Sequence, residues 1–215
     1  MTYLKLASLA VLFYCGSVLA QPSTQVYWGD THLHTSYSLD AFLSLNYSSD
    51  PDTAYRWAKG QPVIHPYTRA KVSINKPLDF LVVSDHAEAM GVIRAIGQGK
   101  LKTNNENLTL GQKIKAWFTE KMVSYKVAER TGMDLFNSDL LPTPDFELTQ
   151  TDDPVLSLHN NTDKNALGDT TPTVKQSWAE MVDIAERHNE PGRFTAFVGW
   201  EWSSIPTGAN LHRVV

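Results

Sequence analysis

Four short motifs in this sequence carry side chains of the types that bind metal ions. They are His32-Leu33-His34, Asp85-His86, Glu201 between two tryptophans, and His212 eleven positions later. In extended backbone, residues i and i+2 share a face, so both imidazoles of the first motif can reach one ion while Leu33 points into the core. Imidazole and carboxylate together suit zinc, manganese or iron, and the residue types do not choose among these ions.

A carboxylate such as Glu201 can bridge two ions, so the set predicts a centre of two or three metal ions in the whole protein. Two ions about 3.5–4 Å apart stabilise the attacking and leaving oxygens of a phosphate ester and lower the pKa of water. Hydrolysis by metal-activated water needs no protein nucleophile, and Ser38 has no evident base partner for a serine-hydrolase triad. We therefore expect a metal-dependent hydrolase of phosphoesterase type, and no catalytic side chain is assigned.

Each motif also has an ordinary explanation. A His-x-His pair often arises by chance, Glu201 fits a buried structural carboxylate, and His212 fits an ordinary strand residue. Four such coincidences at four strand boundaries are much rarer than any one of them, so the set carries the interpretation. We expect Asp30 and Asp85 to orient the ligands without contacting the metal. Which of Asp85 and His86 is the ligand stays open.

Other candidates are weaker. Asp40 fits a helix cap, and His65, in a loop, fits a structural or substrate-facing role better than a ligand. His188 falls at the predicted end of a helix, where a partly charged imidazole complements the helix dipole.

Buried strands must position these motifs. Val26–Asp30 is a short apolar run that leads into the His-x-His pair. Leu78–Val83 is a nearly continuous apolar run, typical of a parallel strand buried on both faces. Arg193–Trp202 is a third strand candidate and contains Glu201. Because parallel α/β sheets gather their chemistry at the carboxyl ends of the strands, the motifs are expected to meet there.

Helices are expected over Pro51–Lys59, Ala87–Ile96, Leu110–Arg130 and Thr173–His188. The third has an amphipathic pattern, with apolar positions at Ile114, Trp117, Phe118, Met122 and Tyr125. In the fourth, Thr173 and Gln176 have the spacing of a capping box. We interpret residues 97–171 as a mainly helical and irregular insertion. The order of elements predicts an α/β barrel or a wound sheet.

The first residues predict export. Residues 1–20 combine a weakly basic start, the apolar run Leu6–Leu19 and a signal-peptidase site at Val18-Leu19-Ala20. The apolar run is short for a membrane span, so a signal peptide is favoured over an anchor, and residues 21–215 form the mature chain. Cleavage removes Cys15, the single cysteine, which excludes disulfides and thiolate metal sites. We expect a periplasmic or secreted protein.

Composition narrows the partners. The 215 residues are 42% hydrophobic and 20% charged, which is typical of a globular protein. A net charge of −4 argues against nucleic acid, so a small-molecule substrate is expected. Composition says nothing of the oligomeric state. The apolar end, Leu211–Val215, has the pattern of a strand and predicts that the natural protein continues further.

The motifs resemble those of a known superfamily. Gly29-Asp30-Thr31-His32-Leu33-His34-Thr35 and the stretch Pro77–Glu88, which contains Ser84-Asp85-His86, look like the opening motifs of the polymerase and histidinol phosphatase (PHP) superfamily. More closely, the chain resembles the DUF3604 family of uncharacterised PHP-like proteins. Supporting stretches are Ala54–Gly60, Glu186–Asn189, Pro191–Phe194, Val198–Trp202 and Asn210–Arg213. The resemblance covers essentially Val26–Val215.

The resemblance implies a distorted (β/α)7-type barrel with a metal cluster at the carboxyl ends of its strands. By motif it assigns His32 and His34 as the first ligand pair, His86 as the ligand of the second motif, Glu201 as the bridging carboxylate and His212 as the later histidine. Superfamily members commonly hydrolyse phosphoesters. Their sites use further His and Asp-x-His ligands downstream, so this chain is expected to hold an incomplete barrel and site.

Two alternatives stay open. One is a non-catalytic metal- or ligand-binding protein that retains the scaffold. The other is a hydrolase of carbohydrate or sulfate esters, with which the six tryptophans and the predicted export are compatible.

Overall fold

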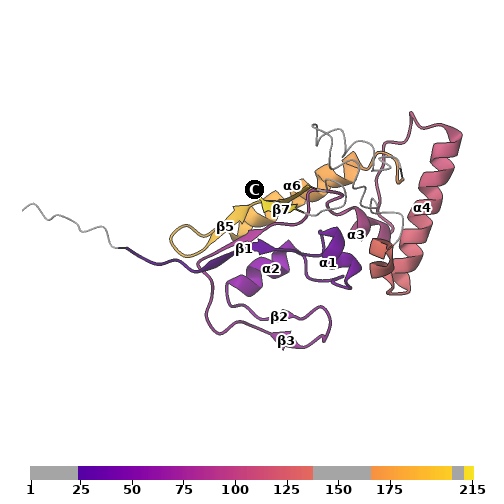
Figure 1. Ribbon diagram of the computed structural model, residues 1–215. Coiled ribbons are helices and arrows are strands. Elements are labelled where there is room, and N and C mark those ends of the chain that lie inside the picture. Colours follow the sequence, from indigo (N-terminus) through magenta and orange to yellow (C-terminus); the bar gives the residue numbers. More distant parts are fainter. Residues whose placement is uncertain (1–23, 138–165, 205–210) are drawn as a thin grey trace, which may run out of the picture.

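The computed structural model describes residues 24–137, 166–204 and 211–215 (Figure 1). The predicted signal peptide, residues 1–20, lies outside the described residues and stays a prediction. No helix within the described ranges is long and apolar enough to cross a membrane.

A parallel sheet of three strands, in the order β1-β4-β5, forms the centre of the molecule. Its strands are β1 (Gly29–Leu33), β4 (Phe80–Val83) and β5 (Thr195–Val198). Phe80 lies opposite both Gly29 and Thr195 in the register. A Cβ atom at Gly29 would lie 2.5 Å from the Phe80 side chain and carbonyl, so glycine permits this close pairing. The predicted parallel α/β arrangement is confirmed, although β1 begins later than expected and runs through His32.

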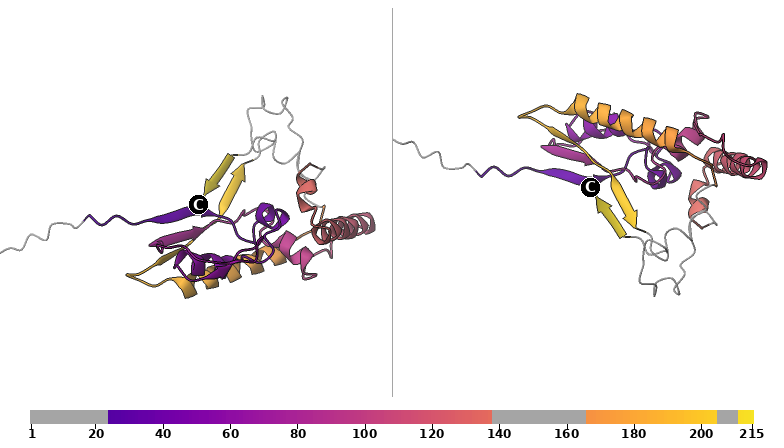
Figure 2. Two further views of the ribbon diagram at one scale, coloured as in Figure 1. Left: turned by 90° about the horizontal axis from the view of Figure 1, so that it is seen from below. Right: turned by 90° about the horizontal axis from the view of Figure 1, so that it is seen from above.

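Two helices, α2 (Pro51–Ala58) and α6 (Thr171–His188), cover one face of the sheet. Figure 2 shows α6 on that side and the β6–β7 pair on the other. Helix α2 begins as its sequence predicts, because the Asp50 carboxylate accepts a hydrogen bond from the Thr53 amide at 2.9 Å. The apolar face of α6 packs on the sheet and α2 in a core whose fully buried members include Tyr55, Leu81 and Met181.

The predicted capping box of α6 is wrong. The helix begins at Thr171, two residues before Thr173. Thr173 is buried inside the first turn, and its hydroxyl donates to the Lys102 carbonyl at 2.8 Å. A capping box is present instead at the start of the helix that begins at Leu110, where the side chains of Thr109 and Gln112 bond each other's backbone amides.

A second core joins four further helices at one end of the sheet. They are α1 (Leu39–Leu43), α3 (Val92–Gly97), α4 (Leu110–Ala128) and the 3-10 helix η1 (Gly132–Asn137). Helix α3 begins five residues later than predicted, because the chain first turns through left-handed conformations at Ala89 and Gly91. The Gly91 amide donates to the Tyr37 carbonyl at 2.7 Å, which ties this turn to the loop after β1.

Helix α4 confirms a predicted helix, but it buries a different face from the one its apolar pattern suggests. The five apolar positions singled out in the sequence are all exposed: Ile114, Trp117, Phe118, Met122 and Tyr125. The helix packs through Ala116, Val123 and Val127 instead. A Cβ atom on Gly97 of α3 would lie 3.1 Å from Val127, so the two helices approach too closely for large side chains.

Two antiparallel pairs complete the described structure. The strands β2 (Val63–Ile64) and β3 (Lys71–Val72) form a hairpin beside α2, as Figure 1 shows. The strands β6 (Glu201–Ser204) and β7 (Leu211–Val214) pair beyond the end of β5. The single predicted strand Arg193–Trp202 is therefore two strands, which are separated at Gly199, where a Cβ atom would lie 2.5 Å from Val82.

The described strands form open sheets and no closed barrel. The mixed α/β class with a parallel sheet is thus confirmed at the coarse level. Within residues 97–171 the described part is largely helical, comprising α4 and η1, and residues 138–165 lie outside the described ranges. The insertion stays a prediction.

A candidate metal centre at the carboxyl edge of the sheet

The predicted ligands meet at the carboxyl ends of the three parallel strands. His32 lies within β1 and His34 directly after it, on the same side of the extended backbone, as the i, i+2 spacing predicts. His86 follows β4 by three positions. Glu201 follows β5 and opens β6, where its amide donates to the Asp85 carbonyl at 3.0 Å. His212 reaches the cluster from β7, where it pairs with Ser203.

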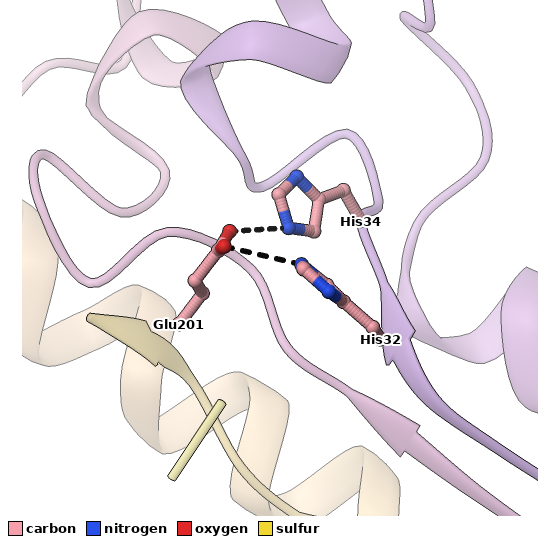
Figure 3. A group of neighbouring side chains, drawn as sticks. All are labelled: His32, His34 and Glu201. Carbon is pink, nitrogen blue, oxygen red and sulfur yellow. Dashed lines mark ion pairs between the residues drawn. The ribbon is translucent and has the colours of Figure 1, made fainter. Parts of the chain in front are cut away.

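Glu201 is the centre of the cluster. Its side chain is 1% exposed, yet four imidazoles approach its carboxylate. Figure 3 shows His32 and His34 pointing at the two oxygens. The Nε2 atoms of His34 and His32 lie 2.6 Å from Oε2 and 3.1 Å from Oε1. The Nδ1 atoms of His212 and His86 lie 2.7 Å from Oε1 and 3.4 Å from Oε2.

These short distances are not hydrogen bonds. Both carboxylate oxygens of Glu201 and Nε2 of His34 are buried without a partner in hydrogen-bond geometry. A buried carboxylate without donors is strongly destabilising, since it has lost its hydration with no replacement. A cation between the lone pairs of the imidazoles and the carboxylate would satisfy all of these atoms together. The orphaned atoms therefore fit a metal centre.

Asp40 orients His34. Its Oδ2 lies 2.9 Å from Nδ1 of His34, and because a carboxylate only accepts, the proton lies on Nδ1. This leaves the lone pair of Nε2 facing Glu201, the arrangement found for histidine ligands backed by a carboxylate. Burial alone would lower the pKa of His34, but the hydrogen bond and charge of Asp40 and the charge of Glu201 outweigh it and raise that pKa.

Sequence reasoning missed this role, because Asp40 fitted a helix cap. Ser38 is the N-cap residue of α1, and Asp40 lies in the first turn of that helix. The Ser38 hydroxyl donates to Oδ1 of Asp40 at 2.5 Å, which fixes the carboxylate. Burial opposes ionisation, yet the bonds from His34 and Ser38 hold the pKa of Asp40 well below its usual range. An acidic residue six positions after the second histidine was the available signal.

Two further polar residues border His86. Its Nδ1 lies 2.8 Å from the hydroxyl of Ser203, which is also 3.4 Å from His212. Glu88 bonds the Ser203 amide through Oε1 at 3.1 Å, and its Oε2 lies 3.8 Å from Nδ1 of His86. Burial lowers the pKa of His86 against the charges of Asp40 and Glu201, which keeps this ring neutral and available as a ligand.

The two aspartates that were expected to support the ligands, Asp30 and Asp85, bond the chain around the His-x-His pair and not the imidazole rings. Asp85 is fully buried and accepts from the amide and hydroxyl of Thr35 at 2.5 and 2.7 Å. Burial raises its pKa to about 6, against these two hydrogen bonds. Asp30 accepts from the His32 amide at 2.9 Å. Both therefore shape the segment that carries His32 and His34, and His86 is the member of its motif that faces Glu201.

The potential ligand atoms form three overlapping groups, each within 4.8 Å: His32, His34 and Glu201; His34, Asp40 and His86; and His86, Glu201 and His212. Glu201 is shared by the first and third groups, which matches the bridging role that the resemblance implies. The donor set of imidazole nitrogens and carboxylate oxygens suits zinc, manganese or iron and does not distinguish them.

Among the described residues, two other histidines lie apart from the cluster. His188, the last residue of α6, bonds Asp52 at 2.9 Å, so its predicted structural role holds. His65 lies in the turn of the β2–β3 hairpin, where its Nδ1 accepts from the amides of Tyr67 and Thr68 at 3.2 and 3.3 Å.

Comparison with known proteins gives one match. A family described as "Protein of unknown function (DUF3604)" matches residues 21–215. No curated protein and no solved structure matches this chain.

Proposed function

The chain belongs to the DUF3604 family, and from that premise we propose that it is an exported, metal-dependent hydrolase of phosphoesterase type on a PHP-like scaffold. The observation that carries the proposal is the convergence of four imidazoles on the buried, unpartnered carboxylate of Glu201. A structural carboxylate needs donors, and this one is surrounded by ring nitrogens from separate elements, none of which bonds it. The PHP-like barrel, of which the described sheet is the opening part, belongs to the same proposal.

The residues present suggest a division of labour. Of the three ligand groups, the two that contain Glu201 are His32, His34 and Glu201, and His86, His212 and Glu201. Asp40 holds the proton of His34 on Nδ1 and so keeps Nε2 free. Divalent ions held there would lower the pKa of water and stabilise negative charge on ester oxygens.

The exposure of the ligands indicates how substrate reaches the site. The side chains of His34, His86 and Glu201 are 17%, 10% and 1% exposed, whereas those of His32 and His212 are 50% and 34% exposed. The deep ligands exclude water from behind the carboxylate, which strengthens its interactions with a cation. We propose that the substrate enters from the side of His32 and His212.

The proposed signal peptide, residues 1–20, gives the compartment. In a periplasmic or secreted setting the protein meets small-molecule esters, and we propose one of these as its substrate.

The test is hydrolysis by the protein after chelation and after separate reloading with zinc, manganese or iron. The panel contains p-nitrophenyl phosphate, bis-p-nitrophenyl phosphate, p-nitrophenyl sulfate and an acetylated oligosaccharide. The proposal predicts turnover of a phosphoester that is lost on chelation and restored by one of the ions. Turnover of the sulfate or the acetylated glycan alone would contradict the phosphoesterase assignment. Tight metal binding with no turnover would favour a binding protein.

A further inference from the structure

A second feature adjoins the metal centre and concerns the substrate. A pocket of about 220 Å³ lies between α2 and the β2–β3 hairpin, and His34 and Thr35 form part of its wall. The imidazole of His34 thus borders the pocket while its Nε2 lies 2.6 Å from Glu201. His34 is thus shared by the pocket wall and the candidate metal centre.

The pocket wall is mostly apolar. Trp57 from α2, Ile64 from β2 and Val72 from β3 are among the side chains that line it. Among the described residues that line it, none is Asp, Glu, Lys or Arg. A cavity of this chemistry selects against a charged or strongly hydrated group, because such a group would lose its hydration without a partner.

The volume limits the size of the occupant. A dry apolar cavity of about 150 Å³ holds a benzene-sized molecule, whereas a whole drug-sized ligand needs roughly 300 Å³ or more. At about 220 Å³ the pocket fits one aromatic ring or a branched alkyl group, and so one part of a larger substrate.

Hydrogen bonds fix the β2–β3 hairpin, which forms one wall of the pocket. The His65 amide donates to the Ala70 carbonyl at 2.9 Å, and Nδ1 of His65 accepts two further amides of the turn. Arg69 donates from Nη1 to the Ser48 hydroxyl at 3.1 Å, which joins the hairpin to the loop before α2.

From these observations we infer that the pocket binds a single aryl or branched alkyl group of the ester, and that His34 separates this apolar subsite from the metal centre. The inference rests on the proposed function. It narrows the substrate class to esters that carry one compact apolar group, and it gives the β2–β3 hairpin the role of the wall that selects them. Ile64 and Trp57 are the specificity-determining side chains.

The experiment compares phenylphosphonate with methylphosphonate by calorimetric titration of the metal-loaded protein. Both probes present the same phosphonate head, so the ratio of their dissociation constants reports the contribution of the apolar group. We expect phenylphosphonate to bind about tenfold tighter or more. The Ile64→Ser variant should reduce that preference by about threefold or more. Its matched control is Ile114→Ser on α4, because Ile64 and Ile114 are 44% and 48% exposed, and the control should leave the preference unchanged.

A second measurement keeps the inference separate from the proposed function. Phenol is titrated into metal-free protein while backbone amide NMR shifts are followed. Phenol-induced shifts that are confined to α2 and β2–β3 and are weaker in Ile64→Ser support the pocket. They do so even if neither phosphonate binds, because that result would count only against the metal-centre proposal. Equal binding of the two phosphonates overturns the inference. Where neither phosphonate binds, an absence of phenol shifts around the pocket overturns it too.

Discussion

In the described part of the chain, two places bring histidine and carboxylate together, and they do so in opposite ways. At the end of α6, Nε2 of His188 lies 2.9 Å from Oδ1 of Asp52. The other Asp52 oxygen accepts from Arg56 at 2.8 Å, and the His188 ring stacks on Tyr55 with ring centroids 5.4 Å apart. Here one imidazole meets one carboxylate, and both carboxylate oxygens have hydrogen-bond partners.

Around Glu201 there are more imidazoles than carboxylates. Four imidazoles share one carboxylate, and its oxygens are buried without hydrogen-bond partners. The polar contact at His188 needs no further group, whereas the cluster at Glu201 leaves ligand atoms that a cation would satisfy. Residue type alone does not separate a structural histidine from a metal ligand. The number of lone pairs that face one buried oxygen does.

The largest effect is expected from Glu201→Gln, which keeps the shape of the side chain and removes its charge. This variant should lose tight metal binding, and phosphoester turnover should fall by more than about 100-fold, because both ligand groups share this carboxylate. Calorimetric metal titration and the rate with p-nitrophenyl phosphate measure the two quantities. Asp52→Asn is the control and should keep both. A Glu201→Gln protein with native metal affinity would erase the contrast between the two sites.

A variant of Asp40, the carboxylate that orients His34, tests the difference between the two sites further. Asp40→Asn should weaken metal binding by about 10–100-fold, since Asp40 fixes the proton of His34 on Nδ1. Asp52→Asn removes an equivalent histidine partner at the other site and should leave metal affinity unchanged. Competition with a chromophoric chelator measures both affinities. If the two variants weaken binding equally, the effect is a general loss of stability and not an effect on the ligand.

Metal should stabilise the fold through the cluster around Glu201 and not through the His188–Asp52 pair. At an ion concentration of about 100 times Kd, one site adds about 2.7 kcal/mol to the free energy of unfolding. For a chain of this size this corresponds to a rise in Tm of about 5–10 °C. In His188→Ala the Tm should be lower with and without metal, but the rise should persist. In His86→Ala the rise should shrink. Scanning calorimetry of the loaded and chelated forms gives all of these values.

The smallest effect concerns pH at the structural pair. Burial would raise the pKa of Asp52, but the bonds from His188 and Arg56 outweigh it and lower that pKa. The folded state therefore binds fewer protons than the unfolded state, so the stabilisation is present above the usual pKa and is lost as the pH falls. We expect Asp52→Asn to lower the free energy of unfolding by about 1 kcal/mol at pH 7, and by less below about pH 3. Urea unfolding at both values checks this, and a loss independent of pH would contradict it.

Much of the site followed from local pattern. The alternation in His32-Leu33-His34 and the apolar run before His86 place their side chains at strand ends, because a strand has a fixed period and a parallel sheet has one carboxyl edge. Glu201 and His212 joined the set because they fall at later strand boundaries. The parallel sheet, α2 and the location of α6 were predicted for the same local reasons.

What sequence could not give depends on contacts between distant elements. Asp40 lies beside His34 because the turn through Ser38 returns α1 toward that ring, and its spacing from His34, the one available signal, fits a helix cap equally well. The buried face of α4 is decided by the close approach of Gly97, which favours Val127 over the larger side chains on the other face. The division of the last predicted strand at Gly199 depends on its packing against Val82.

The most direct test of the account is the metal content of the purified protein, measured by elemental analysis beside a His32→Ala/His34→Ala double variant. His65→Ala serves as a control, since it removes a histidine outside the cluster. The account predicts two or more equivalents of a transition metal in the native protein and in the control, with most of it lost from the double variant. A native protein that binds no metal when zinc, manganese and iron are supplied would contradict the central claim.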